Sequence, residues 1–319
     1  MESSIASRSP TFPQADGMDR MRIVKFLTLS LAALLTPVST SAQTPVPAVA
    51  EIPITTGTMH FVPSTDLGDH REINVWVPPA YPGGKDRYKV LYLLDGGILQ
   101  DFQHIAGLAQ LGALSWTYEP LIVVGIQTVA RRAELTSVPA DARYQAAFPE
   151  SGGSERFRKY LRDEVIPFVE ARYRTADRRA LIGESLAGYF VVDSFLKAPD
   201  LFDDYIAISP SLWWDDRAEA RRAQAWLAKH TPSDRRLYLA MADEGGTMKD
   251  GMNMLVRALD ARDPQGLRWQ FQDKAATETH STIYHGAALD ALRWLYAVPP
   301  GETGAAPWYM VEGGRPASK

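Results

Sequence analysis

The sequence contains no cysteine among its 319 residues. This absence excludes disulfide bonds, thiol nucleophiles and thiolate metal sites. The pattern His-Glu-x-x-His, with which a helix holds zinc, is also missing from the sequence. Any catalysis by this chain therefore depends on hydroxyl, imidazole and carboxylate groups, and we expect it to use neither a metal nor a cofactor.

Long hydrophobic runs and clusters of basic residues are also lacking. The apolar stretch at residues 26–35 is too short to span a bilayer, so we expect no membrane anchor. Without residues 1–42 the chain carries 30 basic and 35 acidic residues, a net charge of about −5. This balance argues against nucleic acids and anionic membrane surfaces as partners.

The N-terminal region has the pattern of a secretory signal. Arg22 and Lys25 precede the apolar stretch, and small residues end it at Ala42. Residues 1–20 do not fit such a signal, so we expect translation to begin at Met18 or Met21. The sequence therefore predicts an exported protein, either periplasmic or secreted.

Four segments follow from this reading. They are an extension with the signal peptide at 1–42, a flexible lead-in at 43–50, a single catalytic domain at 51–298 and a tail at 299–319. With 45% hydrophobic residues the chain can bury one large core.

Strand and helix patterns alternate along residues 51–298. Strands are predicted at 52–62, 71–77, 88–94, 121–126, 179–182, 205–209, 236–242 and 267–271, and helices at 100–112, 155–174, 186–197, 218–229, 247–262 and 283–296. The polar segment 131–153 is predicted to be a long loop over the site. This alternation predicts an α/β-hydrolase fold, with a mostly parallel sheet of about eight strands and helices on both faces.

The stretch around Ser185 predicts a strand, a sharp turn and a helix. Gly183 lies two residues before the serine and Ala187 two residues after it, with Gly188 next, so little side-chain bulk crowds the turn. This is the pattern of a nucleophile elbow, in which the serine hydroxyl projects above the sheet. The alternative is an ordinary strand–helix junction with a capping serine.

A serine nucleophile needs a base, and the six histidines offer two candidates in the right place. In α/β-hydrolases the chain order is serine, acid, histidine. His280 lies in a loop directly after the last predicted strand, whereas His285 lies in the helix that follows. We therefore predict His280 as the general base and keep His285 as the alternative.

The orienting acid and the oxyanion donors are predicted from their positions after strands. Asp243 and Glu244 follow the strand at 236–242, and we favour Glu244 because it lies further past the strand end, although a serine–histidine pair alone is a further option. The oxyanion of acyl transfer needs two N–H donors. We predict the backbone amides of Leu186, which follows the nucleophile, and of Gly97, which follows the third strand.

Two tryptophans follow the predicted strand at 205–209. Trp213 and Trp214 either anchor the loop by packing or form an aromatic wall for the substrate. We keep both interpretations and count both residues as candidate substrate contacts.

Seven phrases resemble, in order and spacing, the putative-esterase family of α/β-hydrolases, which includes esterase D, enterochelin and salmochelin esterases and feruloyl esterases. The phrases lie at residues 90–96, 122–126, 164–167, 173–175, 183–188, 209–214 and 278–280, so they extend over most of residues 52–297. The resemblance implies Ser185 as nucleophile and His280 as base. The chain departs from the family at Glu184, where histidine is common, and at Ala187, where glycine is usual.

The sequence therefore predicts an exported, cofactor-free serine esterase that cleaves a small-molecule ester through an acyl-enzyme. Siderophore-type and aryl esters are the substrate classes that we consider. An acyltransferase or a peptidase with the same triad is the alternative enzyme, and a non-catalytic binding protein on a hydrolase fold is a third interpretation.

Overall fold

The computed structural model describes residues 52–229, 234–262, 265–298 and 308–310. The chain divides into two units, Met1–Ile52 and Pro53–Lys319, and every element below belongs to the second. The predictions for the signal, for the lead-in and for most of the tail lie outside the described residues. No helix among the described residues combines the length and the apolar character needed to cross a bilayer.

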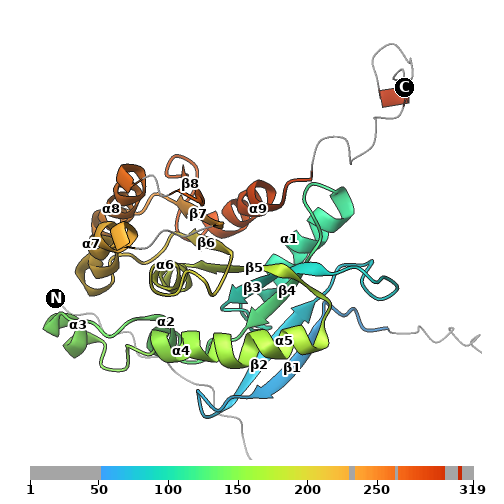
Figure 1. The fold of residues 1–319 in the computed structure, drawn as a ribbon, viewed down its shortest axis with the longest axis horizontal. Coiled ribbons are helices and arrows are strands. Elements are labelled where there is room, and N and C mark those ends of the chain that lie inside the picture. Colours follow the sequence, from blue (N-terminus) through green and yellow to red (C-terminus); the bar gives the residue numbers. More distant parts are fainter. Residues whose placement is uncertain (1–51, 230–233, 263–264, 299–307, 311–319) are drawn as a thin grey trace, which may run out of the picture. The chain divides into compact units, whose positions relative to one another are not determined.

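Eight strands form one sheet in the order β1-β2-β4-β3-β5-β6-β7-β8 (Figure 1). β2 runs antiparallel to both β1 and β4, and the remaining pairs are parallel. This arrangement confirms the predicted fold. The strands are β1 (Thr58–Pro63), β2 (His70–Trp76), β3 (Tyr88–Leu94), β4 (Leu121–Ile126), β5 (Thr175–Glu184), β6 (Asp204–Ile208), β7 (Arg235–Met241) and β8 (Leu267–Asp273).

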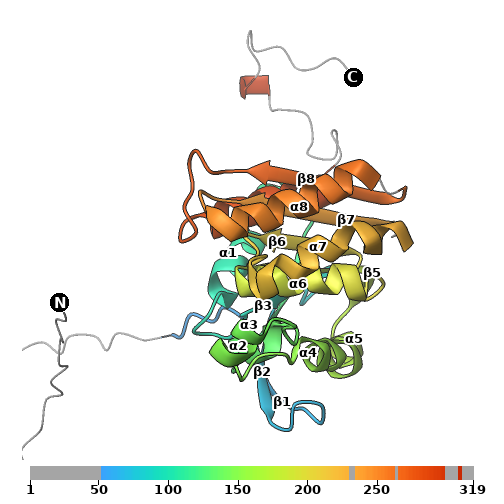
Figure 2. The same ribbon diagram turned by 90° about the vertical axis from the view of Figure 1, so that its left-hand side faces the viewer.

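Helices cover both faces of the sheet because its central strands are apolar on both sides. Every residue of β4 and of β6 is buried. Helices α1 (Phe102–Ser115) and α9 (Ile283–Tyr296) pack on one face. On the other face lie α6 (Leu186–Lys197), α7 (Trp214–Lys229) and α8 (Gly246–Arg262), side by side in Figure 2.

The predicted helix 155–174 is divided in the structure. It consists of α4 (Ser154–Tyr160), a π-helical turn at Leu161–Val165 and α5 (Ile166–Arg172). Pro167 lies at the start of α5, and a proline inside a helix lacks the N–H for the ladder and clashes with a carbonyl of the preceding turn. The wider π turn accommodates this proline, so the chain continues in almost the same direction.

The segment predicted as a long loop contains two short helices. α2 spans Arg131–Leu135 and α3 spans Ala142–Ala147. Local carboxylates stabilise their first turns, because Asp141 accepts a hydrogen bond from the amide of Arg143 at 2.8 Å and Glu134 accepts bonds from the amides of residues 129 and 130. Such caps leave no apolar periodicity in the sequence, so the pattern did not reveal these helices.

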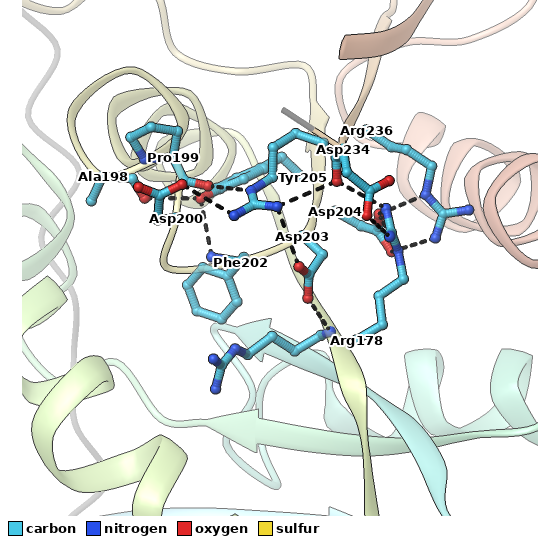
Figure 3. A network of polar contacts seen from close by, with 12 residues as sticks. Arg178, Ala198, Pro199, Asp200, Phe202, Asp203, Asp204, Tyr205, Asp234 and Arg236 are labelled. Atoms are coloured by element: carbon cyan, nitrogen blue, oxygen red, sulfur yellow. Dashed lines mark hydrogen bonds and ion pairs between the residues drawn. The ribbon is translucent and has the colours of Figure 1, made fainter. Parts of the chain in front are cut away.

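A buried ionic network joins the amino ends of three neighbouring strands (Figure 3). Asp204 at the start of β6 is fully buried and accepts hydrogen bonds from Arg178 of β5 at 2.9 Å and from Arg236 of β7 at 2.6 Å. The hydroxyl of Tyr296, on α9, donates to the same carboxylate at 2.8 Å. The network therefore fastens three strands and a covering helix at the end of the sheet opposite the carboxyl ends.

Candidate active site

The turn between β5 and α6 holds Ser185 in a strained conformation. Its φ of 60° and ψ of −118° lie in a region that side chains with a Cβ rarely adopt. A Cβ on Gly183 would lie 2.6 Å from the carbonyl carbon of Ala187, so this position requires glycine. The backbone amide of Ser185 donates to the carbonyl of Ile208 in β6 at 3.0 Å. The turn has the geometry of a nucleophile elbow.

The structure also accounts for the alanine at position 187. Its side chain is fully buried, and a Cβ on Gly183 would lie 2.7 Å from that of Ala187, so the methyl group occupies the space that the missing side chain leaves. Gly188 has a separate role, because a Cβ there would lie 2.8 Å from the carbonyl oxygen of Ile208. Close packing of α6 on β6 therefore depends on Gly188.

Three polar side chains from the carboxyl ends of β5, β7 and β8 form a continuous hydrogen-bonded chain. Nε2 of His280 lies 3.1 Å from Oγ of Ser185, and Nδ1 lies 2.6 Å from Oε1 of Glu244. The Glu244 side chain is 10% exposed and that of His280 is 41% exposed. A carboxylate at Nδ1 favours the tautomer that carries its proton there and leaves the Nε2 lone pair facing Ser185.

The alternatives to Glu244 and His280 lie elsewhere. The side chain of Asp243 is exposed, but its amide donates to the carbonyl of Glu278 at 3.1 Å and so fastens the loop that carries His280 to the turn after β7. His285 is exposed on α9, where its ring contacts that of His104 with 4.8 Å between the centroids. The structure therefore joins Ser185 by hydrogen bonds to His280 and through it to Glu244, rather than to His285 and Asp243.

The two predicted oxyanion donors differ in their availability. Leu186 is the first residue of α6, where an amide has no acceptor within the helix. The amide of Gly97, by contrast, donates to Oε1 of Gln100 at 2.9 Å, and the next amide, of Ile98, donates to Glu72 at 2.5 Å. A substrate oxygen can use Gly97 only by displacing the side chain of Gln100.

The two tryptophans anchor a neighbouring segment. Trp214 is only 1% exposed and its indole N–H donates to the carbonyl of Ser137 at 3.1 Å, so the predicted substrate contact at Trp214 is wrong for this structure. Trp213 is half-buried and stacks on Tyr144 of α3, with 6.2 Å between the ring centroids. The packing interpretation therefore describes Trp214, and Trp213 alone keeps surface that a ligand can reach.

Three residues near the nucleophile were not among the predicted site residues. Oε1 of Glu184 lies 3.4 Å from Nε2 of His280, and Oγ of Ser211 lies 3.4 Å from Oγ of Ser185. Arg131 donates to the carbonyl of Glu184 at 3.2 Å. The departure from the family pattern was the available signal for Glu184, and Ser211 lies within one of the matching phrases, whereas nothing in the sequence around Arg131 indicated its place here.

Burial controls the charge of Glu184. It raises the pKa of the Glu184 carboxyl to about 7, an increase that His280 and Arg131 reduce and that Asp101 and Asp95 reinforce. Burial likewise raises the pKa of Asp101. The imidazole thus has one acid–base neighbour whose charge changes near neutral pH.

The elbow, the strand order and the placement of the three polar side chains define this protein as an α/β-hydrolase. Among the described residues, no group of three or more histidine, aspartate or glutamate side chains could hold a metal ion.

Comparison with known families agrees. The profile of the family described as "Putative esterase" matches residues 64–294, and the chain belongs to this family. It is thus a carboxylic-ester hydrolase.

Two curated relatives carry the names of siderophore esterases. The chain is 24% identical over 265 residues to the ferri-bacillibactin esterase BesA of Bacillus subtilis, which covers 73% of this chain and 90% of the relative. It is 33% identical over 154 residues to the apo-salmochelin esterase of Escherichia coli, covering 44% of this chain and 48% of the relative. Among solved structures, an IroE-like serine hydrolase from Shewanella oneidensis matches with a TM-score of 0.69 and 24% identity, over 76% of this chain and 82% of that one.

Proposed function

We propose that Ser185, His280 and Glu244 form a catalytic triad that cleaves a carboxylic ester through an acyl-enzyme. The supporting observation is the continuous chain from Oγ of Ser185 through the imidazole to Oε1 of Glu244, with distances of 3.1 and 2.6 Å. Both distances are within hydrogen-bond reach, as activation of a serine requires.

Each member of the chain has a distinct part in the reaction. Oγ of Ser185 attacks the ester carbonyl carbon while Nε2 of His280 takes the hydroxyl proton. Glu244 holds the proton on Nδ1 and stabilises the imidazolium. The imidazolium then gives its Nε2 proton to the leaving alcohol, and an acyl group remains on Ser185. Water, deprotonated by His280, releases the acid and restores the enzyme.

The amides of Leu186 and Gly97 are the proposed donors to the oxyanion. Each such donor contributes about 3 kcal/mol at the transition state. Gly97 becomes available when the substrate oxygen replaces Oε1 of Gln100, its partner in this structure.

Labelling with a fluorophosphonate probe tests the nucleophile. We expect the wild type to be labelled and the Ser185→Ala variant to be unlabelled, with kcat for p-nitrophenyl butyrate reduced on the order of 10⁴-fold or more. His280→Ala should lose activity similarly, whereas the control His285→Ala, at an exposed position on α9, should retain it. Equal labelling of the wild type and of the Ser185→Ala variant would refute the proposed mechanism.

For the substrate, we propose a siderophore-type ester such as a catecholate trilactone. The support comes from two relatives that carry siderophore-esterase names. One is aligned with 73% of this chain and the other with 44%. The half-buried Trp213 offers an aromatic surface near the carboxyl end of β6. Aryl esters of plant polysaccharides are the competing class.

A substrate panel separates these classes. We expect kcat/KM for a catecholate trilactone to exceed that for p-nitrophenyl butyrate and for methyl ferulate by at least about tenfold, because 1.4 kcal/mol of added transition-state binding suffices for that ratio. The products are identified by chromatography with mass detection. A preference for methyl ferulate would contradict the siderophore assignment and leave the triad proposal standing.

We also propose that the protein is exported. The support is the charged, apolar and small-residue pattern of residues 21–42. N-terminal sequencing of the protein from the periplasm or medium should show cleavage after Ala42, and an intact N-terminus on protein confined to the cytoplasm would contradict export.

A further inference from the structure

Two side-chain oxygen atoms lie close to Nε2 of His280. Oγ of Ser185 lies at 3.1 Å and Oε1 of Glu184 at 3.4 Å. The Glu184 side chain is 19% exposed, so a charge on it is only weakly screened by water. Glu244 already occupies the other ring nitrogen, at 2.6 Å. The imidazole therefore lies between two carboxyl groups, one at each nitrogen.

The surroundings keep Glu184 in this place. It is the last residue of β5 and precedes the strained serine, so its backbone is set by the sheet and the elbow. Arg131 of α2 donates to its carbonyl at 3.2 Å. The charged and titratable groups around its carboxyl are His280 after β8, Arg131, Asp95 after β3, Asp101 before α1 and Tyr284 of α9.

Arg131 is partly neutralised within this group. Its Nε lies 2.7 Å from Oδ2 of Asp95. The hydroxyl of Tyr284 is buried and has no hydrogen-bond partner among the described residues. The Glu184 carboxylate consequently has His280 as its nearest side-chain cation once the imidazole is protonated.

We propose that Glu184 is a positioning residue that pairs, when ionised, with the imidazolium of His280 and thereby sets the lower pH limit of esterase activity. The inference rests on the proposed function, because it requires His280 to take the proton of Ser185. Glu184 itself exchanges no proton with the substrate.

The proton path explains how the pairing acts. When the bond from Oγ of Ser185 to the substrate carbon forms, the carbonyl electron pair moves to oxygen and the Ser185 proton moves to Nε2. The new Nε2–H lies within reach of Glu184, so the negative carboxylate stabilises the positive ring. The proton then passes to the leaving alcohol, whose bond to the acyl carbon breaks.

The same pairing has a cost in acid. A negative Glu184 makes His280 bind a proton more tightly, and a protonated His280 cannot accept the proton of Ser185. As the pH falls, the first proton is taken up by the pair rather than by either group alone. Without the carboxylate the protonated imidazole loses this stabilisation, so activity should persist into more acidic solution.

The Glu184→Gln variant tests this inference through the pH profile of kcat/KM with p-nitrophenyl butyrate between pH 4.5 and 9. We expect the acid limb to move to lower pH by about one unit or more, the size of shift that an opposite charge produces at this distance. In Glu184→Asp, which keeps the charge, the acid limb should stay close to its wild-type pH. Glu155→Gln, at an exposed position in the first turn of α4, is the matched control for the loss of one negative charge and should leave the limb unchanged.

A second measurement does not depend on activity. In a Ser185→Ala background, the imidazole pKa of His280 followed by NMR should fall when Glu184→Gln is added. An acid limb or a His280 pKa that stays in place in the glutamine variant overturns the inference, whatever happens to kcat. Failure of the proposed function appears separately, as equal fluorophosphonate labelling of the wild type and of the Ser185→Ala variant.

Discussion

At the scale of single residues, Glu244 offers the sharpest contrast with its neighbour in sequence. Its carboxylate is 10% exposed and lies 2.6 Å from Nδ1 of His280, whereas the side chain of Asp243 is exposed. Glu244→Gln removes the charge that supports the imidazolium and offers the ring an amide that can favour the wrong tautomer. We expect kcat to fall by about 10³- to 10⁴-fold, as such substitutions do in serine hydrolases.

The control for this prediction is Asp243→Asn, which makes the same change of charge one residue away. Its kcat for p-nitrophenyl butyrate should stay within about twofold of the wild type, since surface changes rarely act beyond their own contacts. A large loss in the Asp243 variant, with the Glu244 variant active, would assign the orienting role to Asp243 instead.

Glu184 also carries a prediction for stability. Its folded pKa of about 7 lies above the ordinary value of 4.5, so its contribution to stability is fully present below pH 4.5 and is lost as the pH rises through 7. Glutamine does not titrate. We therefore expect the stability of Glu184→Gln relative to the wild type to increase from pH 4.5 to pH 8 by on the order of 3 kcal/mol.

Urea denaturation of both proteins at the two pH values measures this change. If the two proteins differ in unfolding free energy by the same amount at pH 4.5 and at pH 8, the pKa of the Glu184 carboxyl is not raised in the folded state.

At the scale of elements, the start of α7 fastens the segment between β4 and α4. Asp215 is buried and accepts hydrogen bonds from the amides of Ala140 and Asp141 at 3.0 and 2.9 Å, and Tyr144 donates to the carbonyl of Trp213 at 3.0 Å. Asp215→Ala leaves two amides without their acceptor. We expect faster hydrogen exchange over residues 137–148 and a loss of about 1–3 kcal/mol in the free energy of unfolding.

Asp216→Ala is the matched control, because the Asp216 carboxylate pairs with Arg217 and Arg221 instead of accepting hydrogen bonds from the amides of that segment. Hydrogen exchange followed by mass spectrometry on the peptide at 137–148 distinguishes the two variants. Equal protection in both would mean that the segment is held without Asp215.

The same segment shows which elements could be predicted from the sequence. All eight strands were predicted from their apolar and β-prone residues. In β2 to β7 apolar residues are buried by covering helices, whereas the edge strands β1 and β8 contain no buried residue. Helices α2 and α3 depend instead on caps and on the distant Asp215, which no local pattern records. β5 begins at Thr175, whereas the sequence predicted a start at residue 179. The charged residue Arg178 lies within the strand because its guanidinium is paired with Asp204.

The site was predictable to the extent that it follows strand ends. Ser185, His280 and Glu244 each come soon after a strand, and parallel strands place their carboxyl ends together. The occupied amide of Gly97, the burial of Trp214 and the approach of Glu184 to the imidazole depend on side-chain packing between distant segments. Order along the chain does not determine such contacts.

At the scale of the whole molecule, Asp204 is the residue on which the network at the amino ends of the strands depends. Asp204→Asn would remove the anion that Arg178 and Arg236 share, whose side chains are 23% and 15% exposed, and Arg178 would keep only its pairing with the exposed Asp234. Breaking a buried pair from one side costs about 3–5 kcal/mol, and we expect urea denaturation to show a loss of that size. The control Asp200→Asn, 94% exposed, should change stability by less than about 0.5 kcal/mol.

Activity per folded molecule should be unchanged in Asp204→Asn, because Ser185 lies at the opposite end of the sheet. Active-site titration with the fluorophosphonate probe gives the folded fraction. A loss of kcat after that correction would show that the network also controls the geometry of the elbow.

The separation of this network from the carboxyl ends has a consequence for how the family diverges. Register among β5, β6 and β7 is secured at one end of the sheet, so insertions and exchanges in the turns at the other end do not put strand pairing at risk. Substitutions that select a new ester and substitutions that alter this network therefore lie at opposite ends of the sheet, although the two sets of positions alternate along the sequence.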